Sequence, residues 1–496
     1  MAISTAIDQS AVARVVGIKT AFVNLQGGIF LLPQRLAIVG QGSTSSVYST
    51  DKRQITSASE AGSLYGYGSP IHLSALQLFP TNGDGVGTIP VTIYPLEDEN
   101  LSVASTGDII PSGSQTAIAA YKVVISNIES SQFVINIGDS VAVIVASMVE
   151  AINSNINMPV IAVDGTTDVT LTSKWKGLSA NNMKVEVVGS TTAGTSFAIT
   201  QMSGGLINPN IDDALLQFSN VWETIVLNCL DLQDTTTLDK YNVFGEGRWG
   251  ALVKKPLVVF TGTNLTTVND ATTISDARKT DRVNVQLVLP GSKELAFVIA
   301  ARQLVKIIKT ANNNPARDYG SQKATGLIPG SDSVQWNYID RNTAVSKGSS
   351  TIEVKDSVVN LSDIVTFYHP TGEPIPAYRY VCDIIKVQNI IFNLDLIFNT
   401  ERWDGAPLIP NDQPTVNPDA VTPKMAIAEI RNMLDSLNLN AITSEDSDHK
   451  AIILAEISAL NPKRLDIATT LRISGNANII SIDLNFGFYF GTPTVL

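Results

Sequence analysis

Residues 32–42, Leu-Pro-Gln-Arg-Leu-Ala-Ile-Val-Gly-Gln-Gly, set the fold class of the chain. Within this stretch, the apolar run 36–39 follows a proline and ends at a glycine, which is typical of a strand buried on both faces. Helices are predicted next over 55–64 and 69–79, with Pro70 in the first turn of the second helix. A strand follows over 88–94, so the chain begins an α/β domain.

The α/β alternation is interrupted and then resumes. Residues 97–204 are rich in Ser, Thr and Gly and contain short β-type runs around one helix at 141–153. The strands are predicted at 121–125, 133–137, 160–163, 169–172 and 185–188. After 205 the predicted elements are helix 212–219, strand 224–230, helix 238–244, strands 257–260 and 283–289, helix 295–310, and strands 351–354 and 364–368. We therefore favour a β-rich insertion over a separate tandem domain.

The last section has a different character. Residues 381–398 are almost continuously apolar and predict a long helix. Shorter helices are predicted at 424–437 and 448–460, with a strand at 464–468. At the end of the chain, apolar and other residues alternate with a period of two, which predicts a strand with one buried face. Its apolar members are Ile480, Ile482, Leu484, Phe486, Phe488 and Phe490.

These patterns predict a multidomain α/β protein with extended terminal arms. The N-terminal arm covers 1–28, and the α/β core domain covers 29–96 plus 205–376. The inserted β-rich domain covers 97–204, and a C-terminal α+β domain covers 377–475. A C-terminal strand or arm covers 476–496.

Composition excludes several classes of function. Hydrophobic residues make up 44% of the 496 and charged residues 16%, which suits a folded globular chain. The formal net charge of −12 argues against a nucleic-acid partner, because phosphate backbones attract basic patches. Cys229 and Cys382 are far apart, so we expect small buried side chains in a protein made in a reducing cytoplasm. We expect no Sec-type signal and no membrane span, since an arginine and two lysines interrupt the apolar helix 295–310.

A search for catalytic motifs finds little chemistry. The histidines are His72, His369 and His449, and none has metal-ligand spacing. Neither a Walker A sequence nor a GxSxG elbow occurs, although a Ser-His-Asp triad assembled in space stays open at this level. Residues 245–250 spell GxGxxG, but a helix-like stretch precedes them, so we interpret them as a helix-ending turn. We predict no catalytic residue, no metal and no cofactor, and this indicates assembly or binding.

Several ordered motifs resemble the tail sheath proteins of Mu-like contractile phages. They are 32–42, Ala-Gly-Ser-Leu-Tyr-Gly-Tyr-Gly-Ser at 61–69, Asn-Pro-Ala-Arg at 314–317, Gly-Leu-Ile-Pro at 326–329, Asp-Arg-Asn at 340–342 and Arg-Leu-Asp at 464–466. The resemblance extends from about Val12 to Phe490. Asn314 and Asp340 replace the usual Asp and Glu, and Val16 stands where many relatives have proline.

The resemblance implies a structural subunit and not an enzyme. Such subunits polymerise as stacked hexameric rings around a tail tube, exchange terminal strands with neighbouring copies, and contract to drive the tube through the host envelope. Implied partners are other copies of the chain, the tail tube protein, and baseplate and tail terminator proteins, with no nucleic acid and no membrane. The implied location is the virion tail, after assembly in the bacterial host cytoplasm. The insertion 97–204 would face outward, and 377–496 would line the tube.

The expected inter-subunit residues lie in the two arms. They are Val12, Val15 and Ile18 near the start, and Ile480, Ile482, Leu484, Phe486, Phe488 and Phe490 near the end. Lys463 and Arg464 are expected to contact the tube. An isolated two-stranded element is marginal in water, so the terminal strand needs a partner sheet. That sheet could also belong to its own subunit. The alternative functions are another tail or baseplate structural protein and an α/β hydrolase.

Overall fold

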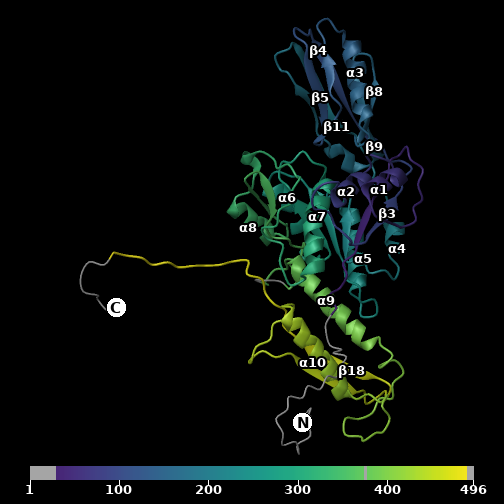
Figure 1. Cartoon of the computed structure of the whole chain (residues 1–496), viewed down its shortest axis with the longest axis vertical. Coiled ribbons are helices and arrows are strands. Elements are labelled where there is room, and N and C mark those ends of the chain that lie inside the picture. The colour runs from purple at the N-terminus through teal and green to yellow at the C-terminus, as the bar shows by residue number, and fades with distance from the viewer. Residues whose placement is uncertain (1–29, 374–376, 489–496) are drawn as a thin grey trace, which may run out of the picture. The chain divides into compact units, whose positions relative to one another are not determined.

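The structure is a computed structural model that describes residues 30–373 and 377–488. The chain divides into two compact units. The larger contains Leu31–Phe392 and the segment from Ile473, and the smaller contains Phe30 and Asn393–Arg472. Figure 1 labels many of their helices and strands.

A six-stranded sheet forms the centre of the larger unit, in the order β14-β13-β12-β1-β3-β2. The five strands from β14 to β3 are parallel, and β2 is antiparallel to β3 at the edge. In this register Leu36 of β1 lies opposite Ile225 of β12 and Val91 of β3. The strands are β1 (Leu36–Gln41), β2 (Arg53–Ile55), β3 (Val91–Leu96), β12 (Ile225–Asn228), β13 (Val258–Thr263) and β14 (Asn284–Val288).

Both faces of this sheet are covered, as the apolar run at 36–39 predicts. Leu36 and Ile38 join a core that includes side chains of α2 and α7, whereas Ala37 and Val39 join a second core that includes side chains of α4 and α5. Alternate residues of one strand therefore enter different cores. The helices of this domain are α1 (Ala58–Tyr65), α2 (Pro70–Leu78), α4 (Asp212–Leu216), α5 (Thr235–Arg248), α6 (Val268–Asp276) and α7 (Ala296–Asn313).

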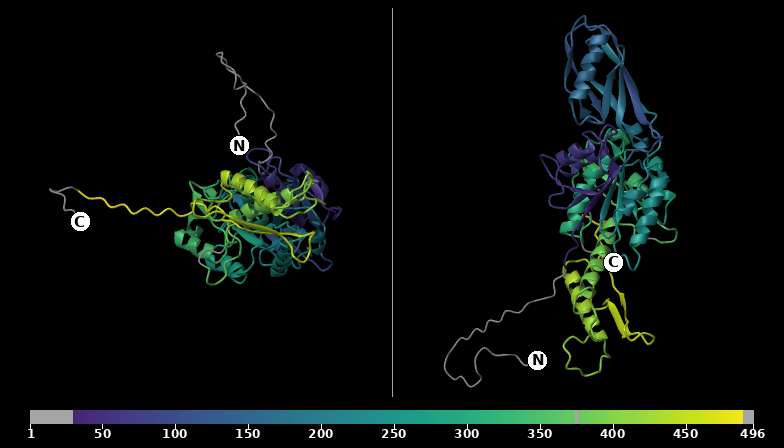
Figure 2. Two further views of the ribbon diagram at one scale, coloured as in Figure 1. Left: turned by 90° about the horizontal axis from the view of Figure 1, so that it is seen from below. Right: turned by 90° about the vertical axis from the view of Figure 1, so that its right-hand side faces the viewer.

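Two antiparallel sheets and one helix build the region between β3 and α4. The sheets have the orders β11-β4-β9-β8 and β10-β5-β6, and β7 also pairs with β5. Helix α3 packs against strands of both sheets, and Figure 2 shows it beside them. The long strands β4 and β11 escaped prediction because Ser, Thr and Gly dominate them. The elements are β4 (Ala104–Gly113), β5 (Ala119–Ile125), β6 (Ile128–Glu129), β7 (Phe133–Ile135), α3 (Val141–Ser154), β8 (Val160–Asp164), β9 (Val169–Lys176), η1 (Leu178–Asn182), β10 (Val185–Gly189) and β11 (Thr195–Ser203).

The rest of the larger unit is short elements followed by a long helix. These are η2 (Asp332–Val334), α8 (Tyr338–Ser346), the hairpin β15 (Ile352–Lys355) and β16 (Val358–Leu361), and α9 (Val381–Phe398), whose residues from Asn393 onward belong to the smaller unit. Asn337 and Asp340 form a reciprocal capping box at the start of α8. The strand predicted over 364–368 is wrong, since that stretch contributes an isolated bridge from Val365 to Tyr380.

The smaller unit contains α10 (Pro423–Leu439) and the hairpin β17 (Ile452–Ile457) and β18 (Leu465–Thr470). Helix α10 packs on β17. The helix predicted over 448–460 is wrong, because β17 occupies its centre. Ile452, Ile453 and Ile457 are β-branched and favour a strand, and pairing with β18 decides the conformation.

Candidate assembly surface

The described part of the C-terminal segment, up to residue 488, does not form the strand predicted over 480–490. Residues 474–488 have neither helix nor strand, and Figure 1 draws them as a plain trace. The apolar side chains of this segment lie in water, each at least 76% exposed, although their spacing is that of a half-buried strand. They are Ile480, Ile482, Leu484, Phe486 and Phe488. The alternative that residues 480–486 lie in a sheet of their own subunit is therefore wrong.

Four predicted interface residues lie outside the described part of the chain. They are Val12, Val15 and Ile18 in the N-terminal arm, and Phe490 at the other end. Their proposed contacts stay predictions.

The hairpin β17–β18 offers a sheet that is open to further strands. Among the described residues it consists of two strands and no third. One face is exposed and partly apolar: Ile452 at 62% and Leu454 at 64% lie opposite Thr470 and Ala468, and the same face continues with Glu456 opposite Asp466. Two-stranded sheets are marginal in water, and open edges recruit strands from other chains. The hairpin thus has the features of an acceptor for added strands.

An ion pair fixes the start of this hairpin to α10. Arg431 of α10 donates from Nη1 to Glu445 Oε2 at 2.8 Å and from Nη2 to the Ala451 carbonyl at 2.8 Å. Glu445 in turn accepts the backbone N–H of Ala451 at 2.7 Å. The half-buried face of β17 turns toward α10, so the exposed face with Ile452 stays available.

The two predicted tube contacts lie at the turn between β17 and β18. Arg464 Nε donates to Asp466 Oδ1 at 2.6 Å, which offsets part of its charge. The Lys463 backbone N–H donates to Asn461 Oδ1, and both basic residues are exposed. Their position at an exposed turn is compatible with a contact to another protein, which stays a prediction.

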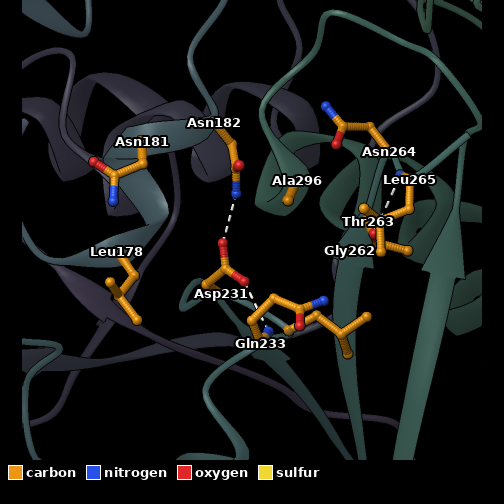
Figure 3. Close-up of a pocket in the computed structure, with 11 residues that line it drawn as sticks. Leu178, Asn181, Asn182, Asp231, Gln233, Gly262, Thr263, Asn264, Leu265 and Ala296 are labelled. Carbon is orange, nitrogen blue, oxygen red and sulfur yellow. Dashed lines mark hydrogen bonds between the residues drawn. The ribbon is translucent and has the colours of Figure 1, made fainter. Parts of the chain in front are cut away.

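A pocket at the carboxyl ends of β12 and β13 is the place where an α/β enzyme would hold its substrate. Figure 3 shows that Asp231 and Asn182 meet there, Asn182 Nδ2 donating to Asp231 Oδ2 at 2.5 Å. Asp231 also accepts the Gln233 N–H, and burial raises the pKa of its carboxyl. None of the described lining residues is a histidine, serine or cysteine. The pocket lies between η1 and the sheet, and its described lining offers no serine–histidine or cysteine–histidine pair to the hydrolase alternative.

The GxGxxG sequence is the end of a helix, as predicted. Gly245 and Gly247 lie in the last turns of α5, which ends at Arg248. A Cβ at Gly245 would lie 2.5 Å from the Val283 side chain, so the residue allows close packing of helix and strand. The sequence therefore does not open a helix as a phosphate loop does.

The histidines and cysteines serve packing and local hydrogen bonds. His72 is buried and its Nδ1 accepts the Gly68 N–H at 3.0 Å, while burial and Lys174 lower the pKa of its ring to about 4. Cys229 and Cys382 are both buried, as predicted. Within 30–373 and 377–488, no group of three His, Cys, Asp or Glu side chains is placed to hold a metal ion. None of the described helices combines the length and apolar character needed to cross a membrane.

The sequence is related over most of its length to a tail sheath protein. No family model matches it. It is 21% identical over 454 residues to the Mu-like prophage FluMu tail sheath protein of Haemophilus influenzae, covering 89% of this chain and 90% of that protein. The predicted resemblance to Mu-like tail sheath proteins is confirmed. That relative is a structural tail sheath protein and not an enzyme.

Solved structures from contractile systems and a sheath tail protein are also similar to the chain. The sheath tail protein Lin1278 from Listeria innocua is 12% identical, with a TM-score of 0.47, covering 90% of this chain and 93% of that one. A chain of the anti-feeding prophage baseplate is 9% identical, with a TM-score of 0.48, covering 96% and 100%. The sheath of an extracellular contractile injection system in its contracted state is 10% identical, with a TM-score of 0.47, covering 96% and 98%.

Proposed function

We propose that the chain is the structural subunit of a contractile tail sheath, located in the virion tail or in a related injection particle. In this proposal the subunits polymerise as stacked hexameric rings around a tail tube and exchange terminal strands. Contraction then drives the tube through the host envelope. Partners are other copies of the chain, the tube protein, and baseplate and tail terminator proteins, with assembly in the host cytoplasm.

One observation carries this proposal. The C-terminal arm exposes apolar side chains and belongs to no described sheet, and the β17–β18 hairpin is a partly apolar sheet of only two described strands. The exposed residues from Ile480 to Phe488 have the spacing of a strand, and the β17–β18 hairpin has room for one. Adding a strand from another copy would satisfy the backbone groups of both and bury both apolar faces. The arms supply the contact between copies.

The energetics suit a polymer better than a dimer. Burial of each arm side chain contributes roughly 1.5–3 kcal/mol, and ordering the backbone costs about 1–2 kcal/mol per residue. The two terms have similar sizes, so one arm adds only a modest net free energy. Many arms acting along a helical polymer give a large total, and the extended polymer is then a kinetically trapped state released by contraction.

The remaining parts of the proposal follow from the domain organisation. The β-rich domain 97–204 would face outward, because an insertion on the inner side would obstruct the tube. The C-terminal domain 377–475 would face the tube, with Lys463 and Arg464 in contact with it. Contraction would use contacts between subunit bodies and would need no nucleotide hydrolysis.

Negative-stain microscopy of the purified full chain tests the proposal. We expect wide hollow polymers; narrow tubes would indicate a tube protein, and the absence of polymers under every assembly condition would refute a sheath. Deleting 1–20 or 479–496 should abolish polymers and leave the melting temperature of the unassembled chain unchanged. If either deletion left the polymers intact, strand exchange by that arm would be wrong.

A further inference from the structure

Helix α9 carries polar side chains that its apolar sequence does not lead one to expect. Lys386, Asn389 and Asn393 are all buried, with exposed fractions of 0%, 0% and 4%. Their spacing of three and four residues places them on one stripe of the helix. Burying a polar group costs free energy unless it is hydrogen bonded, so the hydrogen-bond partners of these three side chains show what the stripe holds in place.

Lys386 binds the beginning of the C-terminal arm. Its Nζ donates to Asp383 Oδ1 at 2.9 Å, to the Ser474 carbonyl at 2.7 Å and to Asn476 Oδ1 at 2.7 Å. An ammonium has three N–H donors, and each one has an acceptor here. The two acceptors other than Asp383 lie where the C-terminal domain meets the arm 476–496, and Asn476 is the first residue of that arm.

Asn476 completes the attachment of this arm. Its Nδ2 donates to the Ala316 carbonyl at 2.9 Å, in the Asn-Pro-Ala-Arg sequence that follows α7. The side chain thus joins α9 to the end of α7. Beyond Asn478 the chain has no regular secondary structure as far as residue 488, and its apolar side chains are exposed. Regular secondary structure therefore ends at this attachment for the described part of the arm.

The N-terminal arm is held by the next residues of the same stripe. Asn389 Oδ1 accepts the Leu32 N–H at 2.8 Å, while its Nδ2 donates to the Ile385 carbonyl at 2.9 Å. Asn393 forms two bonds with Phe30: its Oδ1 accepts the N–H at 3.1 Å and its Nδ2 donates to the carbonyl at 3.0 Å. These are the first described residues after the arm 1–28.

We infer that α9 is the common anchor of both terminal arms, and that Lys386 and Asn389 are the residues that position them. The two attachments lie three residues apart on the helix, a rise of about 4.5 Å. Tension between neighbouring copies then passes from one arm through a single helical turn to the other arm, without crossing the six-stranded sheet. This inference rests on the proposed function, in which both arms reach other copies.

Hydrogen exchange on the unassembled full chain tests the two attachments separately from polymer formation. We expect Lys386→Met to speed amide exchange at 473–478 about tenfold or more, since it removes hydrogen bonds to a charged group. We expect Asn389→Leu to speed exchange at 30–34 about threefold or more. Lys424→Met and Asn432→Leu, at exposed positions of α10, are the matched controls and should change neither segment.

If Lys386→Met does not fold, Asn476→Ala provides the same test, because it keeps the pair of Lys386 with Asp383. Unchanged exchange at 473–478 in a folded variant would overturn the anchor. Absence of polymers from the unmodified chain would instead overturn the proposed function, and the exchange result would still stand.

Shear breakage of polymers tests the shared path. We expect polymers of Lys386→Met and of Asn389→Leu each to break into pieces at least about twofold shorter than those of the control variants. Attachments in series fail at the weaker one, so the double variant should break like the weaker single variant. If the double variant shortened the fragments by the product of the two single effects, each arm would be held independently and the common anchor would be wrong.

Discussion

Replacing Leu484 by serine separates assembly from folding. In the unassembled chain this side chain is 76% exposed, so its loss should change the free energy of unfolding by less than about 0.5 kcal/mol. In the proposed polymer the same side chain is buried in another copy's sheet, where it contributes roughly 1.5–3 kcal/mol. The substitution should therefore raise the concentration for half-maximal assembly by about 10- to 150-fold.

The assay is sedimentation of polymer over a concentration series, with negative-stain images of each pellet. Leu101→Ser is the matched control, because Leu101 is 79% exposed and lies in the β-rich domain that we expect to face outward. It should assemble at the concentration of the unmodified chain. The reasoning fails if Leu484→Ser also assembles at that concentration, or if it lowers the melting temperature of the unassembled chain by several degrees.

Further predictions concern the subunit body. Burial, and to a smaller extent the charge of Lys174, lowers the pKa of His72 to about 4. The free energy of unfolding should therefore fall by about 3 kcal/mol as the pH drops from 6.5 to 4. His72→Gln should make the free energy of unfolding, measured with urea, less dependent on pH over this range. Gly262→Ala should lower the melting temperature and reduce the free energy of unfolding by about 3 kcal/mol or more, because a Cβ at this position overlaps the Ala296 carbonyl. Gly247→Ala should raise the melting temperature and add about 0.5–1 kcal/mol to the free energy of unfolding, because the end of α5 has space for a Cβ and alanine favours a helix. A lower melting temperature would contradict this account. Hydrogen bonds from Lys306 and Lys309 of α7 lower the pKa of Asp84 to about 2. These bonds should therefore stabilise the folded chain above pH 4, and this stabilisation should be lost toward pH 2. If an Asp84→Asn variant unfolded in acid at the same pH as the unmodified chain, this prediction would be wrong.

Local patterns predicted the five parallel strands of the central sheet and several of its helices, but they missed the edge strand β2 and helix α6. The run 36–39 became β1 with both faces buried, and the helix predicted over 295–310 became α7. Strongly apolar and periodic segments give such signals because burial dominates their conformation. Strands β4 and β11 gave weak signals, since their stability comes from pairing with each other and with β9.

The candidate assembly surface was predicted only in part. Alternation singled out the residues from Ile480 to Phe488, but it placed them in a strand that the isolated chain does not form. The acceptor hairpin was missed at β17, where a helix was predicted. Lys386 gave a faint signal as a charge within an apolar helix, and Asn476 gave none, because a polar residue in a loop is ordinary.

The sequence by itself determined the α/β core, the lack of catalytic motifs and the apolar spacing of the C-terminal arm, because these depend on the order of residues along a few turns or one strand. Only the tertiary structure decided that β17 pairs with β18 and that buried polar residues of α9 bond to residues 30–32 and 474–476. The paired residues of the hairpin lie 8 to 18 positions apart and the bonded residues at α9 lie 88 to 363 apart, and no local pattern records which buried donor will meet which distant acceptor.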